Sequence, residues 1–273
     1  VLPEGEKSNI MFNRLNKNLG VLHAVVYSKA SDEVKPRLLE ALVENPEMGA
    51  REFERLAQKL EEEAKAKAEA EVKAEADICC TSANAVQVVE SVYSDEILFV
   101  PDQYLGNYVS TKTAKQMTLW PGHCPTHTRI KREDILRLKS EHPEAKVVVH
   151  PECRPEVIGL ADEVSGTGGM IRYARRDDVK ELIVGTETGI IHRLRKENPA
   201  KTFIPVSEQA ICPDMKLSTL ERIAQALEEM QPQVKVPEWI TVRAKSALDK
   251  MMSVAGGEIN GDVETKGLPS LRR

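Results

Sequence analysis

Apolar residues are spaced differently at the start of this chain and in the rest of it. They recur at helical intervals over residues 32–45, and Pro46 follows, which predicts a helix with Pro36 in its first turn. Residues 51–76 are rich in Ala, Glu and Lys, and their few large apolar side chains gather near Phe53. We expect a largely solvated helix or a linker there.

From residue 77 onward, short β-rich runs alternate with helical segments. This alternation predicts parallel α/β sheets covered by helices on both faces, with ligands bound in the loops that follow the strands. The predicted strands are residues 78–81, 96–100, 116–120, 146–150, 181–185 and 202–205. The predicted helices are residues 84–93, 132–142, 155–161, 168–176, 189–198, 216–230 and 239–252.

A faint internal repeat suggests how these elements are grouped. Cys124-Pro125 and Cys212-Pro213 each precede a predicted helix, and about one α/β domain of chain separates them. We therefore expect repeated three-layer αβα sandwich units in a pseudo-symmetric array, following an N-terminal helical segment. The predicted divisions are a helical segment over residues 1–69, αβα units over 70–130 and 131–254, and a disordered tail over 255–273.

Composition and charge narrow the class of protein. The chain has 273 residues, a net charge of −5 and 4% aromatic residues, so Val, Ile, Leu and Ala must supply most of the core. An acidic chain predicts no nucleic-acid partner, and the lack of an apolar run of about 20 residues predicts no membrane span. With neither a signal-peptide pattern nor an even number of cysteines, we expect a cytoplasmic protein without disulfides.

The strand predicted over residues 146–150 ends in His150-Pro151-Glu152-Cys153. An apolar strand that ends in an imidazole and a carboxylate is not explained by packing, because burying both groups without partners is costly. We expect His150 and Glu152 to face a polar cavity, where they can move protons near neutral pH. A surface pair is the alternative, and we expect Cys153 to be buried packing.

Three further strand-end loops open helices. Thr81 or Ser82 could cap the helix that follows, or their loop could bind an anion, and the sequence leaves these two interpretations equal. The glycines of residues 165–169 let backbone amides approach a ligand, although the loop lacks the dinucleotide-binding pattern. For residues 185–189, capping by Thr186 or Thr188 is the favoured interpretation.

The two Cys-Pro loops are candidate metal ligands. Zinc sites typically use paired Cys-x-x-Cys units, which are absent, whereas iron–sulfur clusters take thiolates from distant loops, often with Pro after Cys. Cys124 and Cys212 therefore fit a cluster better than zinc, but two unrelated core cysteines are at least as compatible with the spacing. Cys79 and Cys80 lie in a predicted strand, where neighbouring side chains point to opposite faces and would not share a metal.

Taken together, seven segments resemble quinolinate synthase in order and spacing. They are AEVKAEADICCTSANAVQVV (70–89), PDQYLGNYV (101–109), GHCPTH (122–127), HPEC (150–153), GTGGMI (166–171), GTETGIIHRL (185–194) and CPDMK (212–216). The resemblance implies three αβα units around a central [4Fe–4S] cluster. It also implies condensation of iminoaspartate with dihydroxyacetone phosphate to quinolinate in NAD biosynthesis, with a functional link to L-aspartate oxidase.

The resemblance also assigns roles to residues. Cys124 and Cys212 correspond to cluster ligands, and His150 and Glu152 correspond to substrate-binding, acid–base residues. Ser82 and Thr167 correspond to residues that hold the substrate's anionic groups, while His127 is expected to bind substrate beside the cluster.

The chain departs from the family pattern at several points. The first unit, with the first cluster cysteine, is not recognisable in residues 1–64, and Lys65-Ala66-Lys67 stands where the family has Tyr-Val-Asn. Gly166 replaces a serine usual before Thr167. The alternative hypothesis is a non-catalytic truncated paralogue that binds a small dicarboxylate, a phosphate or a partner chain. A missing unit would expose apolar surface, so we also expect self-association.

Overall fold

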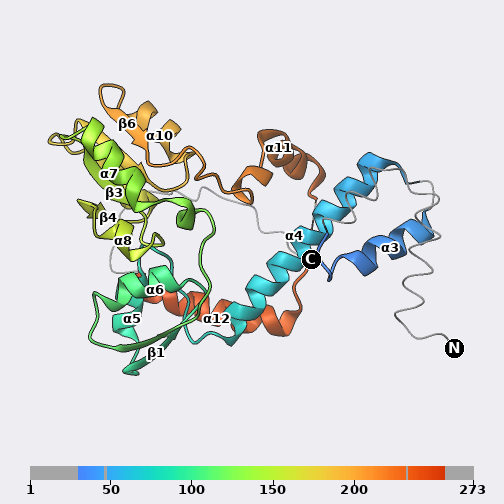
Figure 1. The fold of residues 1–273 in the computed structure, drawn as a ribbon. Helices are drawn as coiled ribbons and strands as arrows, with labels where there is room; N and C mark the ends of the chain where they lie inside the picture. The colour runs from blue at the N-terminus through green and yellow to red at the C-terminus, as the bar shows by residue number, and fades with distance from the viewer. Residues whose placement is uncertain (1–29, 46–47, 232, 256–273) are drawn as a thin grey trace, which may run out of the picture. The chain divides into compact units, whose positions relative to one another are not determined.

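The computed structural model describes residues 30–45, 48–231 and 233–255. Contacts divide the chain into two compact units (Figure 1). Of the described residues, the first unit contains those up to Asp77 together with those within Leu220–Ala247, and the second contains Ile78–Thr219 and residues 248–255. Beyond residue 255 the predicted disordered tail lies outside the described residues, as do residues 1–29 of the N-terminal segment.

The first unit is helical. Helices α3 (Lys35–Glu44) and α4 (Ala50–Glu75) pack through one buried cluster that includes Leu38, Phe53 and Leu60. Pro36 lies in the first turn of α3, where its missing N–H costs no hydrogen bond. The helix predicted over residues 32–45 is confirmed, and residues 51–76, for which a solvated helix or a linker was expected, lie in helix α4 but for the last residue. The unit also contains α11 (Leu220–Glu229) and most of α12 (Glu238–Ala255).

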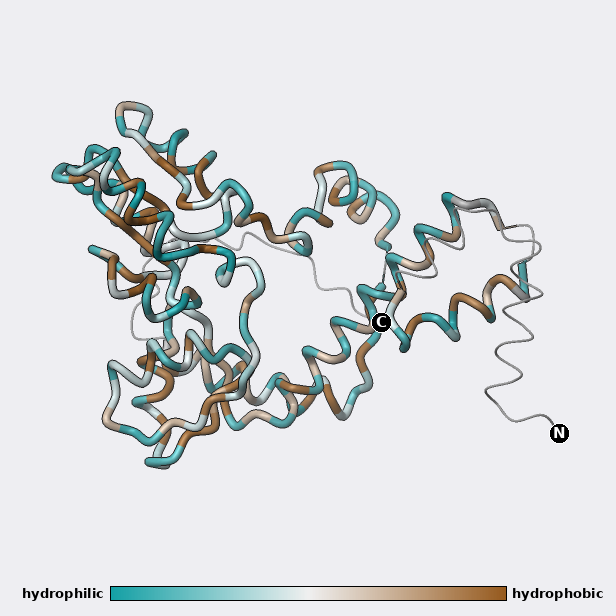
Figure 2. Tube along the Cα trace, viewed as in Figure 1, coloured by the Kyte–Doolittle hydropathy of each residue, from teal (hydrophilic) through white to brown (hydrophobic). Residues whose placement is uncertain are grey.

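The second unit contains a four-stranded parallel sheet in the order β4-β3-β5-β6. Its strands are β3 (Lys146–Val149), β4 (Glu163–Val164), β5 (Glu181–Gly185) and β6 (Thr202–Pro205). The apolar runs of β3 and β5, residues 147–149 and 182–184, are drawn as hydrophobic segments in Figure 2. They are apolar throughout because helices cover both faces of the sheet.

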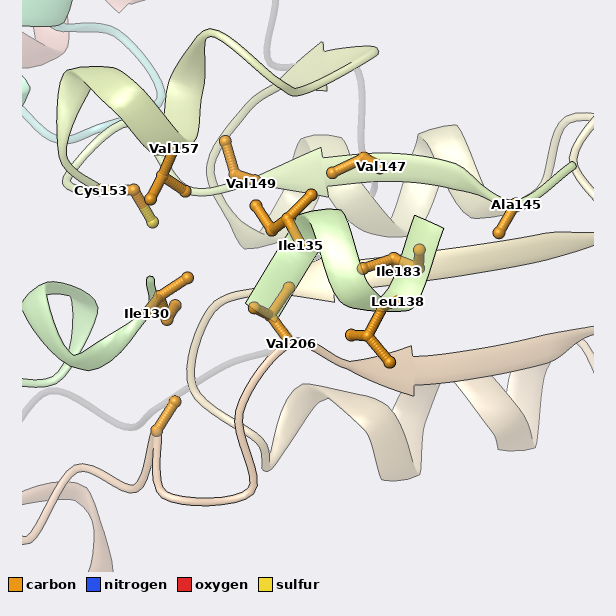
Figure 3. Packing of buried hydrophobic residues seen from close by; sticks show 11 residues of the cluster. Ile130, Ile135, Leu138, Ala145, Val147, Val149, Cys153, Val157, Ile183 and Val206 are labelled. Carbon is orange, nitrogen blue, oxygen red and sulfur yellow. The ribbon is translucent and has the colours of Figure 1, made fainter. Parts of the chain in front are cut away.

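Alternation along the strands divides the core of this sheet into two clusters. Val147, Val149 and Ile183 face α7 (Arg132–Glu141) and α8 (Pro155–Ile158), where Ile135, Leu138 and Val157 pack against them (Figure 3). On the other face, Val148, Leu182 and Val184 pack against α9 (Thr167–Ala174) and α10 (Ile190–Glu197). The four-stranded sheet and the helices on its two faces therefore form a three-layer αβα sandwich.

A second parallel sheet pairs β1 (Glu96–Phe99) with β2 (Gln116–Leu119). Helices α5 (Ala85–Ser91) and α6 (Gln103–Ser110) pack against it through a cluster that includes Val89, Phe99 and Val109. The predicted α/β class, with short parallel sheets after N-terminal helices, is confirmed. Five of the six predicted strands form at or within one residue of their predicted bounds.

The strand predicted over residues 78–81 was wrong, and helix α6 and the short strand β4 were not predicted. Residues 78–81 form no strand, because no neighbouring chain in the described residues offers them a ladder of backbone hydrogen bonds. Instead the Thr81 amide donates to Asn84 Oδ1 in a local turn. Helix α6 was not predicted, because it is short and contains a glycine, Gly106. In the structure this glycine is required, since a side chain there would meet Leu119 Cδ2 at 2.6 Å. Asp102 stabilises α6 by accepting from the Tyr104 and Leu105 amides.

Candidate functional site

The candidate site lies where the parallel strands β3 and β5 end side by side. Val149 is in register with Gly185, so the residues after each strand come out at the same edge of the sheet. His150 and Glu152 follow β3, and Thr186 follows β5. Cys153 is fully buried among the apolar side chains under the sheet, as predicted (Figure 3).

Two buried imidazoles form the centre of this group. His127, in the 3₁₀ turn η1 (His127–Arg129), stacks on His150 with ring centroids 4.3 Å apart. His127 Nε2 lies 2.9 Å from Thr186 Oγ1 and is hydrogen-bonded to it. His127 Nδ1 lies 3.0 Å from Glu152 Oε2 but is not aligned with it as a hydrogen bond.

Cys124 completes the group. Its amide donates to Asp102 Oδ2 at 2.7 Å, so the N-cap of α6 also holds the Cys-Pro loop in place. The Cys124 thiol is close enough to interact with both His127 and Glu152. One ligand atom from each of these three residues lies within 4.8 Å of the others, and these donors could hold a metal ion.

The pKa values at this site shift in opposite directions. Burial would lower the pKa of His127, but its contacts with Cys124 and Glu152 outweigh burial and raise the pKa to about 9. Burial and the neighbouring charge of His127 lower the pKa of His150 to about 4. The pKa values of Cys124 and Glu152 are both lowered, because the interactions with His127 outweigh their burial. The imidazole of His150 is therefore neutral at pH 7, whereas His127 is protonated.

Cys212 is not part of this group of three donors, but a series of contacts links the two Cys-Pro loops. Glu187, next to Thr186, has a lowered pKa because Lys216, the Gly189 amide and the nearby Cys212 amide all favour its charged form over the effect of burial. Its side chain also lies 2.9 Å from Lys216 Nζ and accepts from the Gly189 amide at 2.7 Å. The loop after β5 thus contacts His127 on one side and the second Cys-Pro loop on the other.

The two residues expected to bind anions also come from loops that meet. A side chain at Gly166 would lie 3.0 Å from Ser82 Oγ, so this hydroxyl lies against the backbone just before Thr167. The nearby Ser165 Oγ is buried and has no hydrogen-bond partner among the described residues. Neither Ser82 nor Thr81 caps a helix: the N-cap of α5 is Asn84, whose side chain makes no cap hydrogen bond.

The favoured interpretation of Thr186 and Thr188 as helix caps was wrong. The N-cap of α10 is Gly189, with no side-chain cap, and Thr186 contacts His127 instead. Sequence reasoning also missed Asp102, Glu187 and Lys216. The signal for Asp102 was its position before an apolar helical turn. No local pattern marked the other two, because their partners come from different loops.

Comparisons with known proteins match most of the chain. A family model described as Quinolinate synthetase A protein matches residues 48–253. A protein named Quinolinate synthase from Dehalococcoides mccartyi is 63% identical over 179 residues, which cover 66% of this chain and 59% of that protein. Quinolinate synthase 1 of Methanosarcina acetivorans is 54% identical over 177 residues, covering 65% and 58% respectively.

A third relative gives the same coverage. Quinolinate synthase of Geotalea uraniireducens is 52% identical over 179 residues, which cover 66% of this chain and 59% of the relative. The chain therefore spans less than two thirds of the length of the curated relatives that it matches. The described residues contain no helix long and apolar enough to cross a membrane.

Proposed function

The chain belongs to the quinolinate synthetase A protein family, and from this premise we propose that it condenses iminoaspartate with dihydroxyacetone phosphate to form quinolinate. The observation that carries the proposal is the meeting of Cys124, His127, His150 and Glu152 at one sheet edge. Such a group combines a metal-binding thiol with side chains that transfer protons. Both are needed for a condensation that loses water and phosphate.

The protonation states support separate roles for these side chains. Glu152 has a lowered pKa and is ionised at neutral pH, so it can accept a proton from the substrate. His150 is neutral and can exchange hydrogen bonds with substrate without adding charge. Protonated His127 offers the positive charge that a carboxylate or phosphate of the substrate requires. We assign His150 and Glu152 as the catalytic pair.

Hydroxyl groups supply the second part of the proposed site. The Ser82 hydroxyl lies against Gly166, the residue just before Thr167 at the start of α9, and the Ser165 Oγ beside Gly169 has no hydrogen-bond partner among the described residues. Neither the Ser82 nor the Thr167 hydroxyl makes a capping hydrogen bond at the start of α5 or α9, so both can donate to anionic oxygens of a ligand. We propose that Ser82 and Thr167 hold the carboxylate or phosphate groups of the two substrates.

We propose a [4Fe–4S] cluster as the cofactor, with Cys124 and Cys212 as two of its ligands. The donor chemistry fits, because the lowered pKa of Cys124 favours the thiolate that binds iron. The contacts from His127 through Thr186 and Glu187 to Cys212 support a shared centre. When bound, such a cluster with an open iron supplies a Lewis acid for the oxygen that leaves as water.

The proposed reaction also implies a partner and a compartment. Iminoaspartate must be supplied by oxidation of aspartate, so we propose a functional link to L-aspartate oxidase. We expect the enzyme in the cytoplasm, where reducing conditions keep free cysteines as thiols.

The test is anaerobic reconstitution with iron and sulfide, followed by a quinolinate assay with iminoaspartate and dihydroxyacetone phosphate. We expect one cluster per active site, and Glu152→Gln should lower the rate about 100-fold while leaving the iron content unchanged. The solvent-exposed Glu156→Gln is the matched control and should retain full activity. A fully loaded protein that forms no quinolinate would contradict the proposal and favour the non-catalytic paralogue.

We further propose that the chain self-associates through helix α11. Leu220, Ile223 and Leu227 lie along one face of this helix and are 81%, 49% and 72% exposed. Their spacing of three and then four residues is that of a helix seam that packs against a second helix. A second copy of this chain presents the same face, so two copies can bury both stripes.

A further inference from the structure

A pocket of about 520 Å³ lies against helix α10 in the second unit. Helix α10 runs beside β6 (Figure 1) and forms one wall, and Pro205 and Glu208, at the end of β6 and in the loop after it, form the other. We propose that this pocket binds a phosphate monoester with a compact apolar body. The inference goes beyond the proposed function, which gives no role to any residue of this lining.

Both walls of the pocket are fixed to the sheet. Leu194 of α10 and Phe203 of β6 are buried in one apolar cluster beneath the pocket's walls. The Thr188 amide donates to the Ala210 carbonyl at 3.0 Å, and this bond joins the segment before α10 to the loop after β6. The pocket is therefore formed before any ligand arrives, and binding does not have to order a loop.

Three side chains of α10 supply groups that bind anions. They are His192, Arg195 and Lys196, and all three are exposed along the pocket. Arg195 Nη2 donates to the Phe203 carbonyl at 3.1 Å, which holds the guanidinium beside β6 while its other N–H groups stay available. His192 and Lys196 are four residues apart, so they lie on the same face of the helix.

A neighbouring arginine on the same helix shows how positive charge is neutralised outside the pocket. Arg193 Nε lies 2.7 Å from Glu197 Oε1, and Arg175 Nη2 lies 2.9 Å from Glu197 Oε2. Neither Arg195 nor Lys196 has such an ion pair among the described residues. The helix dipole favours basic residues in a last turn, but it does not explain why these two line a pocket.

The lining selects a phosphate over a carboxylate. Two permanent cations, Arg195 and Lys196, share the pocket with a single carboxylate, Glu208, which leaves an excess of positive charge. A phosphate monoester carries a charge of about −1.5 to −2 at pH 7, and its oxygens suit both the fork of a guanidinium and an ammonium. A monocarboxylate would neutralise only one of the two cations.

The size and the apolar part of the lining select an ester over the bare ion. Small-molecule sites have volumes of roughly 300–1,000 Å³, so this pocket has room for an organic body as well as a phosphate group. Ile191 and Pro205 give that body an apolar surface beside the cations. The Thr188 hydroxyl adds a hydrogen-bonding group to the same lining.

The test is isothermal titration calorimetry of the full chain with three probes. Phenyl phosphate has both a phosphate and an apolar body, inorganic phosphate lacks the body, and benzoate replaces the phosphate with a carboxylate. The salt concentration is about 0.15 M, which screens long-range attraction to exposed charges. We expect phenyl phosphate to bind about tenfold more tightly than either of the other two probes.

Matched variants locate the binding. Arg195→Gln and Lys196→Gln should each weaken phenyl phosphate binding about tenfold or more, because each removes a charged donor. Arg193→Gln makes the same change of charge on the same helix but outside the pocket, and should bind normally. Ser82→Ala removes a hydroxyl proposed to hold the substrates and should also bind normally. Circular dichroism establishes that each variant is folded, and if Arg195→Gln is not, Lys196→Gln decides.

Three results would overturn the inference. Equal affinity for phenyl phosphate and inorganic phosphate would show that no organic body is bound. Equal losses in Arg193→Gln and Lys196→Gln would show diffuse attraction to α10, and a loss in Ser82→Ala would place the phosphate at the proposed substrate site. Binding is measured without turnover, so the result does not depend on whether the chain forms quinolinate.

Discussion

At the scale of single residues, the stacked imidazoles of His127 and His150 show how neighbours divide their protons. Two positively charged rings with centroids 4.3 Å apart would repel each other, so protonation of one ring disfavours protonation of the other. His127 is the charged one, because Cys124 and Glu152 both raise its pKa and Glu152 Oε2 lies 3.0 Å from its Nδ1. His150 has a carboxylate farther away, with Nδ1 3.8 Å from Glu152 Oε2, and remains neutral.

The neutral state of His150 predicts how stability depends on pH. Its folded pKa of about 4 lies below the ordinary value of 6.5, so the unfolded chain binds this proton first. The stabilisation is present above pH 6.5 and is lost as the pH falls toward 4. When the pH falls from 6.5 to 4.5, the free energy of unfolding of the unmodified protein should fall. In His150→Gln this fall should be smaller by about 1–3 kcal/mol.

Urea unfolding at intervals of half a pH unit measures this difference. His192→Gln is a suitable control, since His192 lies on the outer part of α10 and should follow the unmodified protein. If the free energy of unfolding of His150→Gln and of the unmodified protein falls equally below pH 6.5, the prediction is wrong and His150 titrates normally.

The thiols should differ in reactivity for the same electrostatic reasons. The pKa of Cys124 is lowered, whereas burial raises the pKa of Cys80 to about 11 and that of Cys153 to about 12. Because the thiolate is the nucleophile, iodoacetamide at pH 7.5 should modify Cys124 of the metal-free protein at least tenfold faster than the other two. Peptide mass spectrometry over a time course measures the rates, and equal rates at Cys124 and Cys80 would contradict the prediction.

At the scale of elements, the loop from β2 to η1 is positioned by close backbone contacts. The Gln103 amide donates to the Gly122 carbonyl at 2.8 Å, and two residues later the Cys124 amide bonds to Asp102. This part of the loop therefore lies directly against the start of α6. Gly122 permits the approach, because a Cβ there would collide with the Pro101 carbonyl oxygen.

Gly122→Ala should therefore displace the loop. Its Cβ would meet backbone, which cannot rotate away, so we expect a loss of about 1–3 kcal/mol and a fall in Tm of about 2–8 °C. Gly159→Ala is the control, since its Cβ would lie 3.5 Å from the Pro155 carbonyl oxygen, an ordinary contact. Differential scanning calorimetry compares the two, and equal Tm values would contradict the argument.

At the scale of the whole molecule, helix α11 leaves large apolar side chains exposed. None of its residues is buried, although its sequence is strongly amphipathic. Arg222, on another side of the helix, pairs with Glu62 of α4 at 2.8 Å. Polar contacts thus hold α11 within the first unit, while its apolar stripe remains available to a second copy.

Sedimentation velocity tests this self-association. We expect the sedimentation coefficient to rise with protein concentration, and Leu227→Lys should shift the equilibrium at least tenfold toward the monomer because it places a charge in the stripe. Gln225→Lys adds the same charge beside Glu229, outside the stripe, and should associate normally. A monomer at all concentrations, or equal effects of the two variants, would reject α11 as the interface.

The sequence by itself determined the elements and the family of this protein. The hydrophobic pattern of a strand and the residues that end it are both local in the sequence. For this reason β5 and β6 begin and end where they were predicted. The same local information failed at residues 78–81, because a strand also needs a neighbouring strand. It also favoured Thr186 as a cap, although nothing near Thr186 in sequence could reveal its contact with His127.

Tertiary structure alone decided which side chains meet. The parallel register of β3 and β5 brings Glu152 and Thr186 to one edge, and the Asp102 cap brings Cys124 and His127 to the same place. These contacts join residues far apart in the chain, so no local pattern contains them. Their pKa values follow from burial and from the neighbouring charges, which exist only once the chain has folded.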